Sequence, residues 1–149
     1  MRERVGVAKG KSSEIARFWP MMGPYLTSSD VHKEFQIAPV DDSETVWFIL
    51  YMKGGRNVPD HESLVGFCCA RITENKVTLH YDFVREQYRD KQYSASTLFK
   101  IRKQYLEQNH PDLPVEISTK DKQLIDRLKN SGFKTDGKRG SFTVLRKAA

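Results

Sequence analysis

The sequence predicts a mixed α/β (α+β) fold in which helices flank a mostly antiparallel central sheet, in the approximate order βααβββαβαββ. Two observations support this fold class. The middle of the chain carries three consecutive strand-like runs with short links, which is typical of an antiparallel meander. The last third alternates helical and strand-like segments, as mixed α/β domains do. The chain has 149 residues and no repeat or linker, so we expect one domain over 1–149.

The N-terminal segments predict one strand and two short helices. Residues 4–9 alternate apolar and polar side chains, as a half-buried strand does. A helix capped at 12–13 runs to Pro20, which disturbs or ends it. A break at 23–24 precedes a second short helix over about 28–35.

Three apolar runs predict the strands of the meander. TVWFILYM (45–52) is β-branched and aromatic, and it is long enough for a buried strand. SLVGFCCARI (63–72) and KVTLHYDFV (76–84) follow it. GGRNVPD (54–60) is the first connecting loop and TENK is the second.

The C-terminal elements are predicted to be a helix (94–108), a strand (115–119), a helix (121–132) and two strands joined by a turn around 136–140. The first helix places Leu98, Ile101, Tyr105 and Leu106 along one side, which we expect to face the core. Gly132 is a plausible C-terminal stop for the second helix.

The composition excludes several classes of protein. The chain is 38% apolar and 30% charged, which favours a soluble globular protein. No apolar run approaches the roughly 20 residues that cross a bilayer, and the start lacks a signal core, so we expect no membrane partner and a cytoplasmic location. The neighbouring Cys68 and Cys69 predict reduced core residues rather than a disulfide framework or zinc site. The four histidines are scattered, so we expect no metal.

The positive charge is concentrated in one part of the chain. Residues 1–99 carry 13 basic and 13 acidic side chains, whereas residues 100–149 carry 12 basic and 6 acidic ones. The whole net charge of +6 therefore belongs to the last third. This asymmetry indicates either an anionic partner, which includes nucleic acid, a phosphorylated cofactor or an acidic protein, or a solvated basic helix face.

Two stretches, together with the order of elements, resemble the GNAT acyltransferase family. FVREQYRDKQYSASTL is similar to the family's cofactor-binding segment, in which a strand ends, an Arg or Gln follows, and glycines open a helix. Arg89 fits the first position, whereas Gln92 and Ser94 stand where glycines are usual. DRLKNSGFKTDGKRGSFTVLRK is similar to the family's C-terminal end. The resemblance covers most of 44–149, and it implies acetyl-CoA or another acyl-CoA as co-substrate.

The cofactor turn also has a physical interpretation. A turn that feeds a helix N-terminus directs unpaired backbone N–H groups and partial positive charge at one place, where a diphosphate binds readily. Arg89 and Lys91 would add full charges, and Ser94 is either a phosphate donor or the helix N-cap. The residues expected to bind the cofactor are Phe83, Val84, Arg89, Asp90, Lys91, Gln92, Tyr93, Ser94 and Ala95.

The resemblance implies that the strand before the turn diverges from its neighbour and that the acyl group lies in the opening. A main-chain N–H near Phe83 and Val84 would stabilise the oxyanion while an amine attacks the thioester directly. Strand alternation predicts that His80, Asp82 and Val84 share one face. Asp82 is the first candidate for the base that deprotonates the amine, and His80 is the second.

The leaving thiolate needs a proton donor. Where many family members have a tyrosine on the last helix, this chain has Leu128. Tyr88 and Tyr93 flank the cofactor turn and are substitute donors. Ser118 is another candidate, unless it caps the helix that follows with Asp121 three residues on.

These observations leave three hypotheses. The first is an acyl-CoA-dependent N-acyltransferase that acts on an amine of an unidentified acceptor. The second is a nucleic-acid base-modification protein like the phage Mom family, which would bind phosphates through the basic C-terminal third. The third is a non-catalytic binding module on the same fold. G-x-S-x-G, Walker and H-E-x-x-H motifs are absent from the sequence.

Overall fold

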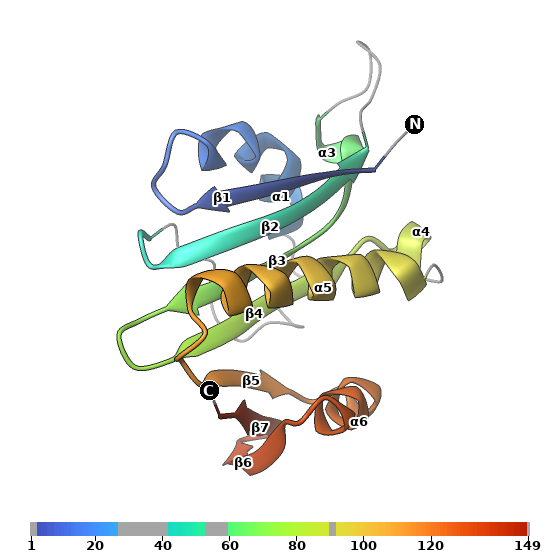
Figure 1. The fold of residues 1–149 in the computed structure, drawn as a ribbon. Coiled ribbons are helices and arrows are strands. Elements are labelled where there is room, and N and C mark those ends of the chain that lie inside the picture. Colours follow the sequence, from blue (N-terminus) through green and yellow to red (C-terminus); the bar gives the residue numbers. More distant parts are fainter. Residues whose placement is uncertain (1–2, 27–41, 53–59, 90–91, 149) are drawn as a thin grey trace.

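The computed structural model describes residues 3–26, 42–52, 60–89 and 92–148. Within these ranges, seven strands form one sheet in the order β1-β2-β3-β4-β5-β7-β6 (Figure 1). The strands are β1 (Glu3–Lys9), β2 (Thr45–Met52), β3 (Leu64–Ile72), β4 (Val77–Val84), β5 (Val115–Thr119), β6 (Lys134–Arg139) and β7 (Phe142–Lys147).

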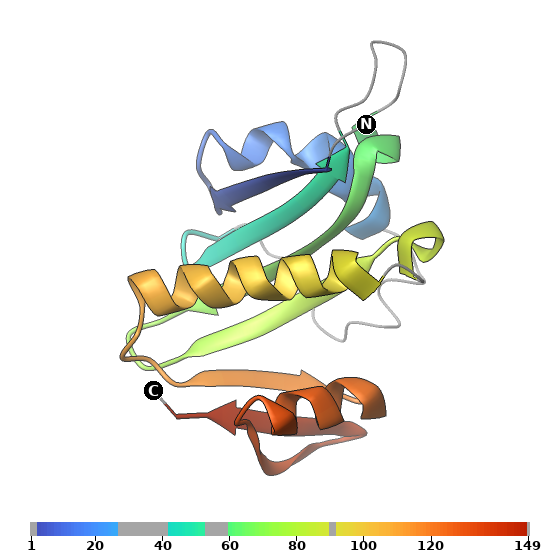
Figure 2. The same cartoon turned by 45° about the vertical axis from the view of Figure 1, so that its right-hand side comes forward.

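Helices cover both faces of this sheet. The helical segments are η1 (Ile15–Arg17), α1 (Trp19–Leu26), α3 (Asp60–Ser63), α4 (Glu86–Arg89), α5 (Gln92–Asn109) and α6 (Lys122–Asn130). Figures 1 and 2 show α5 and α6 on one face and α1 on the other. We call these faces the α5 side and the α1 side.

The sheet is mostly antiparallel, as the sequence predicts. β4 and β5 form the parallel pair, and the other neighbouring pairs are antiparallel. A parallel pair needs a crossover, which α5 supplies between β4 and β5.

The core has two layers because the central strands are buried on both faces. In β2, Val46, Phe48 and Leu50 pack on the α5 side, whereas Trp47 and Ile49 pack on the α1 side. A strand covered on both faces has an unbroken apolar sequence rather than an alternating one, which explains the run TVWFILYM. The inward positions predicted for α5 are also confirmed, since all four side chains belong to the α5-side core.

The N-terminal helix differs from the sequence-based prediction. Pro20 lies at the start of α1 rather than at its end, and Pro24 lies inside the helix instead of forming a break. Proline is tolerated in a first helical turn because the N–H that it lacks has no partner there. The helix then continues past Pro24 while Met22 and Leu26 bury their side chains in the α1-side core. The helix predicted over 28–35 lies outside the described residues.

The C-terminal turn is also displaced from its predicted position. Residues 136–139 belong to β6, and the chain reverses at Gly140 and Ser141. Gly140 has a φ of 63°, which suits glycine in a tight reversal. Gly132 follows α6 with a φ of 98°, which confirms it as a helix stop.

Cys68 and Cys69 are free thiols with 1% of their surface exposed. Their prediction as core residues is therefore confirmed. Burial raises the pKa of Cys68 to about 12. Among the described residues, no helix has both the length and the apolar character that crossing a membrane requires.

Candidate functional site

The parallel strands β4 and β5 separate soon after they meet. They pair from Val77–Val115 to Leu79–Ile117 and no further along the described register. β4 nevertheless continues to Val84, and β5 continues to Thr119. Beyond the last pair, no other strand among the described residues pairs with the β5-facing edge of β4.

A β-bulge in β4 lies at the same level. Phe67 of β3 opposes Phe83, and Cys69 opposes His80. Between these two pairs β4 therefore contains one more residue than β3. The extra residue reverses the alternation of side chains along β4, so that residues beyond the bulge face the opposite side of the sheet from the one that simple alternation predicts. Leu79 packs in the α5-side core, whereas Phe83 packs in the α1-side core.

The bulge corrects the prediction that His80, Asp82 and Val84 share one face. His80 opposes Cys69 and lies on the α1 side. Asp82 reaches the α5 side, where it binds Arg102 of α5. Val84 also belongs to the α5-side core. Simple alternation fails because it assumes one residue of β4 for each residue of β3.

Asp82 is held by a buried arginine. Arg102 donates from Nη1 to Oδ1 of Asp82 at 2.5 Å and from Nη2 to Oδ2 at 3.2 Å. Its side chain is 2% exposed and that of Asp82 is 37% exposed. Burial alone would lower the pKa of Arg102, but the Asp82 carboxylate raises it above its ordinary value. The guanidinium of Arg102 therefore keeps its charge.

Arg102 is a site residue that the sequence analysis missed. It lies midway between Leu98 and Leu106, so helical spacing places it on the inward stripe. A charged side chain at such a position needs a buried partner. An arginine on the inward stripe of a helix was therefore the signal in the sequence that could have identified Arg102.

His80 and Ser118 lie on either side of the point where the strands part. Each follows the last residue of the parallel pairing, His80 after Leu79 and Ser118 after Ile117. Both face the α1 side, because Leu79 and Ile117 face the α5 side. Burial lowers the pKa of His80, although the Asp82 carboxylate partly opposes this shift. The lowered pKa favours the neutral imidazole, which is the form that can accept a proton.

Ser118 does not cap α6, which corrects one of its predicted alternatives. The N-cap is Asp121, whose carboxylate accepts from the backbone N–H of Gln123 and Leu124. Thr119 accepts in turn from the N–H of Asp121.

The predicted cofactor turn is shorter than expected. The helix α4 occupies 86–89, and α5 begins at Gln92. Gln92, Tyr93, Ser94 and Ala95 therefore lie in the first turn of α5, so Ser94 is not its N-cap. Asp90 and Lys91 lie outside the described residues, as do the side chains of 92–96.

Arg89 is exposed and folds back on β4. Its Nε donates to the carbonyl of Val84 at 2.7 Å, and its guanidinium lies 5.7 Å from the centre of the Phe83 ring. The structure thus brings Phe83, Val84 and Arg89 together at the end of β4, beside the N-terminus of α5. This is the end of the strand that is not paired with β5.

Tyr88 lies in α4 and packs against the α5-side core. The guanidinium of Arg85, which the sequence analysis did not single out, lies 5.8 Å from its ring centre. Arg85 also donates to the carbonyls of Glu62 and Leu64 at 2.8 and 3.0 Å. It thereby fastens the end of β4 to the start of β3.

Part of the C-terminal positive charge is neutralised within the protein. Glu116 is 3% exposed and binds Lys76, Arg146 and Arg139 at 3.2, 2.7 and 3.6 Å. A nucleic-acid partner for this region stays a prediction. Within the described ranges, no three His, Cys, Asp or Glu side chains gather as metal ligands would.

Solved structures similar to this one cover nearly its whole length. Escherichia coli ElaA aligns with a TM-score of 0.73 and 11% identity, over 98% of this chain and 99% of that one. A Pseudomonas aeruginosa acyl-CoA N-acyltransferase aligns at 0.72 and 13% identity, over 99% and 100%. The PaiA N-acetyltransferase of Thermoplasma acidophilum, in complex with coenzyme A, aligns at 0.57 and 15% identity, over 98% and 99%.

This is the GNAT fold. The sequence itself matches no family model and no curated protein in these comparisons. The similarity to GNAT proteins therefore lies in the arrangement of the strands and helices. It covers the N-terminal elements that the sequence resemblance left out.

Proposed function

We propose that the protein is an acyl-CoA-dependent N-acyltransferase that transfers an acyl group, with acetyl-CoA as the expected donor, to an amine of its acceptor. The observation that carries this proposal is the separation of β4 from β5 directly beside the N-terminus of α5. An opening in the sheet and an anion-binding helix end then lie together, in a fold shared with a protein that has been solved with coenzyme A.

In this proposal the diphosphate binds at the start of α5. The first N–H groups of a helix have no intrahelical partner, and the helix dipole adds partial positive charge there. Residues 89–95 supply these groups, with Arg89 and Lys91 adding cationic charge. The pantetheine arm then runs along the open edge of β4, past Val84 and Phe83, to the thioester.

The reaction is a direct acyl transfer. The amine attacks the thioester carbonyl, the new C–N bond forms, and the C–S bond breaks to release the coenzyme A thiolate. A main-chain N–H on the open edge of β4 stabilises the oxyanion. A base takes the proton that the amine loses. A proton donor supplies the proton that the coenzyme A thiolate takes up.

We propose His80 as the base and Ser118 as the donor to the thiolate. Both lie at the point where the strands part, and the lowered pKa of His80 favours its neutral imidazole. Asp82 stays a prediction for the base, but its two carboxylate oxygens already accept from Arg102. Tyr88 and Tyr93 stay predictions for the donor.

A thermal-shift titration with acetyl-CoA tests the cofactor site. Binding to the native state raises Tm, by an amount that grows with ligand concentration. We expect the double variant Arg89→Ala/Lys91→Ala to lose this shift. A matched control, Lys134→Ala/Lys138→Ala on the exposed strand β6, should keep it. An unchanged Tm at millimolar acetyl-CoA would refute the proposal.

Transfer is tested separately with radiolabelled acetyl-CoA and a panel of amines, peptides and nucleic acids. Labelling of an amine supports the acyltransferase. Binding of acetyl-CoA without labelling across the panel would instead support a binding module.

A further inference from the structure

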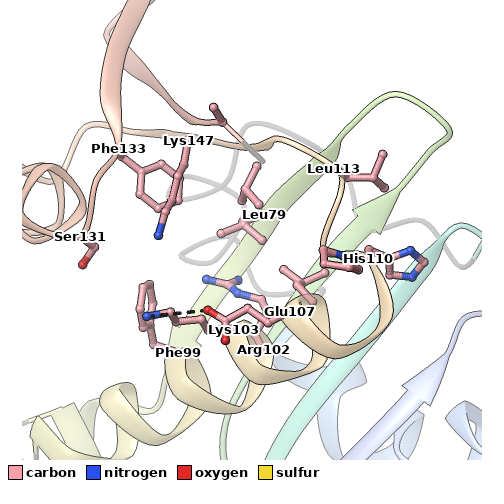
Figure 3. Close-up of a pocket in the computed structure, with 14 residues that line it drawn as sticks. Leu79, Phe99, Arg102, Lys103, Glu107, His110, Leu113, Ser131, Phe133 and Lys147 are labelled. Carbon is pink, nitrogen blue, oxygen red and sulfur yellow. Dashed lines mark ion pairs between the residues drawn. The ribbon is translucent and has the colours of Figure 1, made fainter.

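A second pocket lies on the α5 side, away from the proposed cofactor site. Its volume is about 250 Å³, and it is lined by α5 from Phe99 onward, by β4, by the start of β5, by the segment after α6 and by the end of β7 (Figure 3). Its apolar lining includes Leu79, Phe99, Leu106, Leu113, Val115 and Phe133. The acyl-transfer proposal gives no role to this space.

The pocket and the proposed diphosphate site use different parts of α5. The α5 residues that line the pocket begin at Phe99, whereas the proposed diphosphate site ends at Ala95. At 1.5 Å per residue, Phe99 lies about 6 Å and Leu106 about 16 Å along the helix from Ala95.

Cations dominate the polar part of the lining. Among the described residues, the lining carries three cations and one carboxylate. The cations are Arg102, Lys103 and Lys147, and the carboxylate is that of Glu107. Arg102 is neutralised by Asp82, and Lys103 lies 4.0 Å from Glu107. Lys147 has no carboxylate partner in the part of the chain that the structure describes, and its Nζ lies 6.0 Å from the centre of the Phe133 ring. Figure 3 shows the Lys147 ammonium and the Lys103–Glu107 pair bordering the same space.

We propose that this pocket binds a small aromatic carboxylate, with its ring among the apolar side chains and its carboxylate beside Lys147. The volume suits this ligand, because an apolar cavity of about 150 Å³ already holds benzene. The charge also suits it, since Lys147, for which the described residues offer no carboxylate partner, stands next to an aromatic ring. A few convergent polar groups around an apolar cavity are typical of small-molecule sites.

Ligand binding would change the environment of Asp82 in β4, because Arg102 contacts both the pocket and Asp82. This guanidinium lines the pocket and also holds Asp82 at the bulge, with a further hydrogen bond to the carbonyl of Cys69. A ring that packs against Arg102 therefore contacts a side chain joined to both β3 and β4.

The test is a titration of the whole protein with 3-phenylpropionate, followed by amide NMR shifts. We expect saturable shifts at Leu106, Leu113 and Phe133, together with a shift at Asp82. The neutral amide 3-phenylpropionamide should bind about fivefold more weakly, because it loses the charge interaction with Lys147. Lys147→Met should weaken the carboxylate to the same extent, and Lys138→Met on exposed β6 should not.

A second variant tests the space rather than the charge. Leu113→Trp, in the loop before β5, fills the pocket and should abolish the shifts while Tm stays close to that of the wild type. Shifts that do not saturate, or that persist unchanged in both Lys147→Met and Leu113→Trp, would overturn the proposal. Neither result bears on acetyl-CoA binding, which is measured with a different ligand and other variants.

Discussion

Arg102 of α5 binds Asp82 of β4 at the bulge of that strand, with two hydrogen bonds of 2.5 and 3.2 Å. Nη1 of the same guanidinium donates to the carbonyl of Cys69 in β3 at 3.3 Å. One buried side chain therefore ties the helix to two neighbouring strands. The extra residue of β4 is held just beyond the level where β4 leaves β5, so we expect the shape of the opening to depend on this contact.

The first prediction concerns the stability of this pair. Asp82→Ala leaves a guanidinium that is 2% exposed without its counterion, so we expect it to cost about 3–5 kcal/mol of unfolding free energy. Arg102→Met leaves a carboxylate that water reaches, so it should cost less, about 1–3 kcal/mol. Urea unfolding of the two variants and of the double variant gives the coupling energy.

The exposed pair Lys103–Glu107 of the same helix is the matched control. Its two side chains are 51% and 64% exposed, so its coupling energy should be about 0.5 kcal/mol or less. A coupling energy for Arg102–Asp82 as small as that of the control would contradict a clamp at the bulge.

The second prediction concerns the pH dependence of the reaction. The proposed base must be neutral, so activity should fall as pH drops through the pKa of His80. Burial places this pKa below 6.5, and the acid limb of kcat/KM should therefore lie below pH 6.5. We expect His80→Gln to lower kcat by about 10²-fold or more and to remove that limb, with acetyl-CoA binding unchanged.

Asp82→Asn, assayed at a temperature where it is folded, is the comparison for His80→Gln. It should keep the acid limb even if its rate is lower. If the limb instead persists in His80→Gln and vanishes in Asp82→Asn, the role of base passes to Asp82.

Local sequence patterns predicted the strands well because those patterns arise from local burial. TVWFILYM corresponds to β2 at both ends, since both faces of that strand are covered and the run ends where burial ends. The crossover helix α5 was likewise predicted from the spacing of its apolar residues. Its start was placed two residues late, at Ser94 instead of Gln92, because a serine resembles an N-cap.

The candidate site was harder to predict because it depends on contacts between distant segments. The bulge in β4 follows from the register against β3, which the sequence of β4 does not contain. The partner of Asp82 lies twenty residues away, within the crossover helix α5. Local alternation therefore placed Asp82 beside His80, whereas the structure places these side chains on opposite sides of the sheet.

The third prediction concerns Glu116 and acid stability. Burial alone would raise the pKa of Glu116, but hydrogen bonds from Arg146 and Lys76 lower it below its ordinary value. A lowered pKa in the folded state contributes stability above the unfolded pKa, near 4.3, and that stability is lost as pH falls below it. Glu116→Gln should thus destabilise the protein at pH 7, and its difference from the wild type should shrink below about pH 4.3.

The measurement is thermal unfolding of both proteins between pH 3 and pH 7. Glu107→Gln, which alters an exposed carboxylate on α5, is the control and should change Tm little at any pH. A difference for Glu116→Gln that stays constant across the range would show that the carboxylate charge contributes nothing.

The last prediction tests whether the end of β4 must keep its position for catalysis. A Cβ on Gly66 would lie 2.5 Å from the carbonyl oxygen of Phe83 and 3.1 Å from Cα of Val84, so Gly66→Ala must move the backbone of β4. A displacement of about 1 Å near reacting groups costs about 10²-fold in rate, and we expect a loss of that order in kcat. Gly6→Ala on β1 is the control, because its added Cβ meets the side-chain ring of Phe18 rather than the backbone of β4. Both variants should lower Tm, but equal losses of activity in the two would show that the position of Phe83 and Val84 is not what limits the reaction.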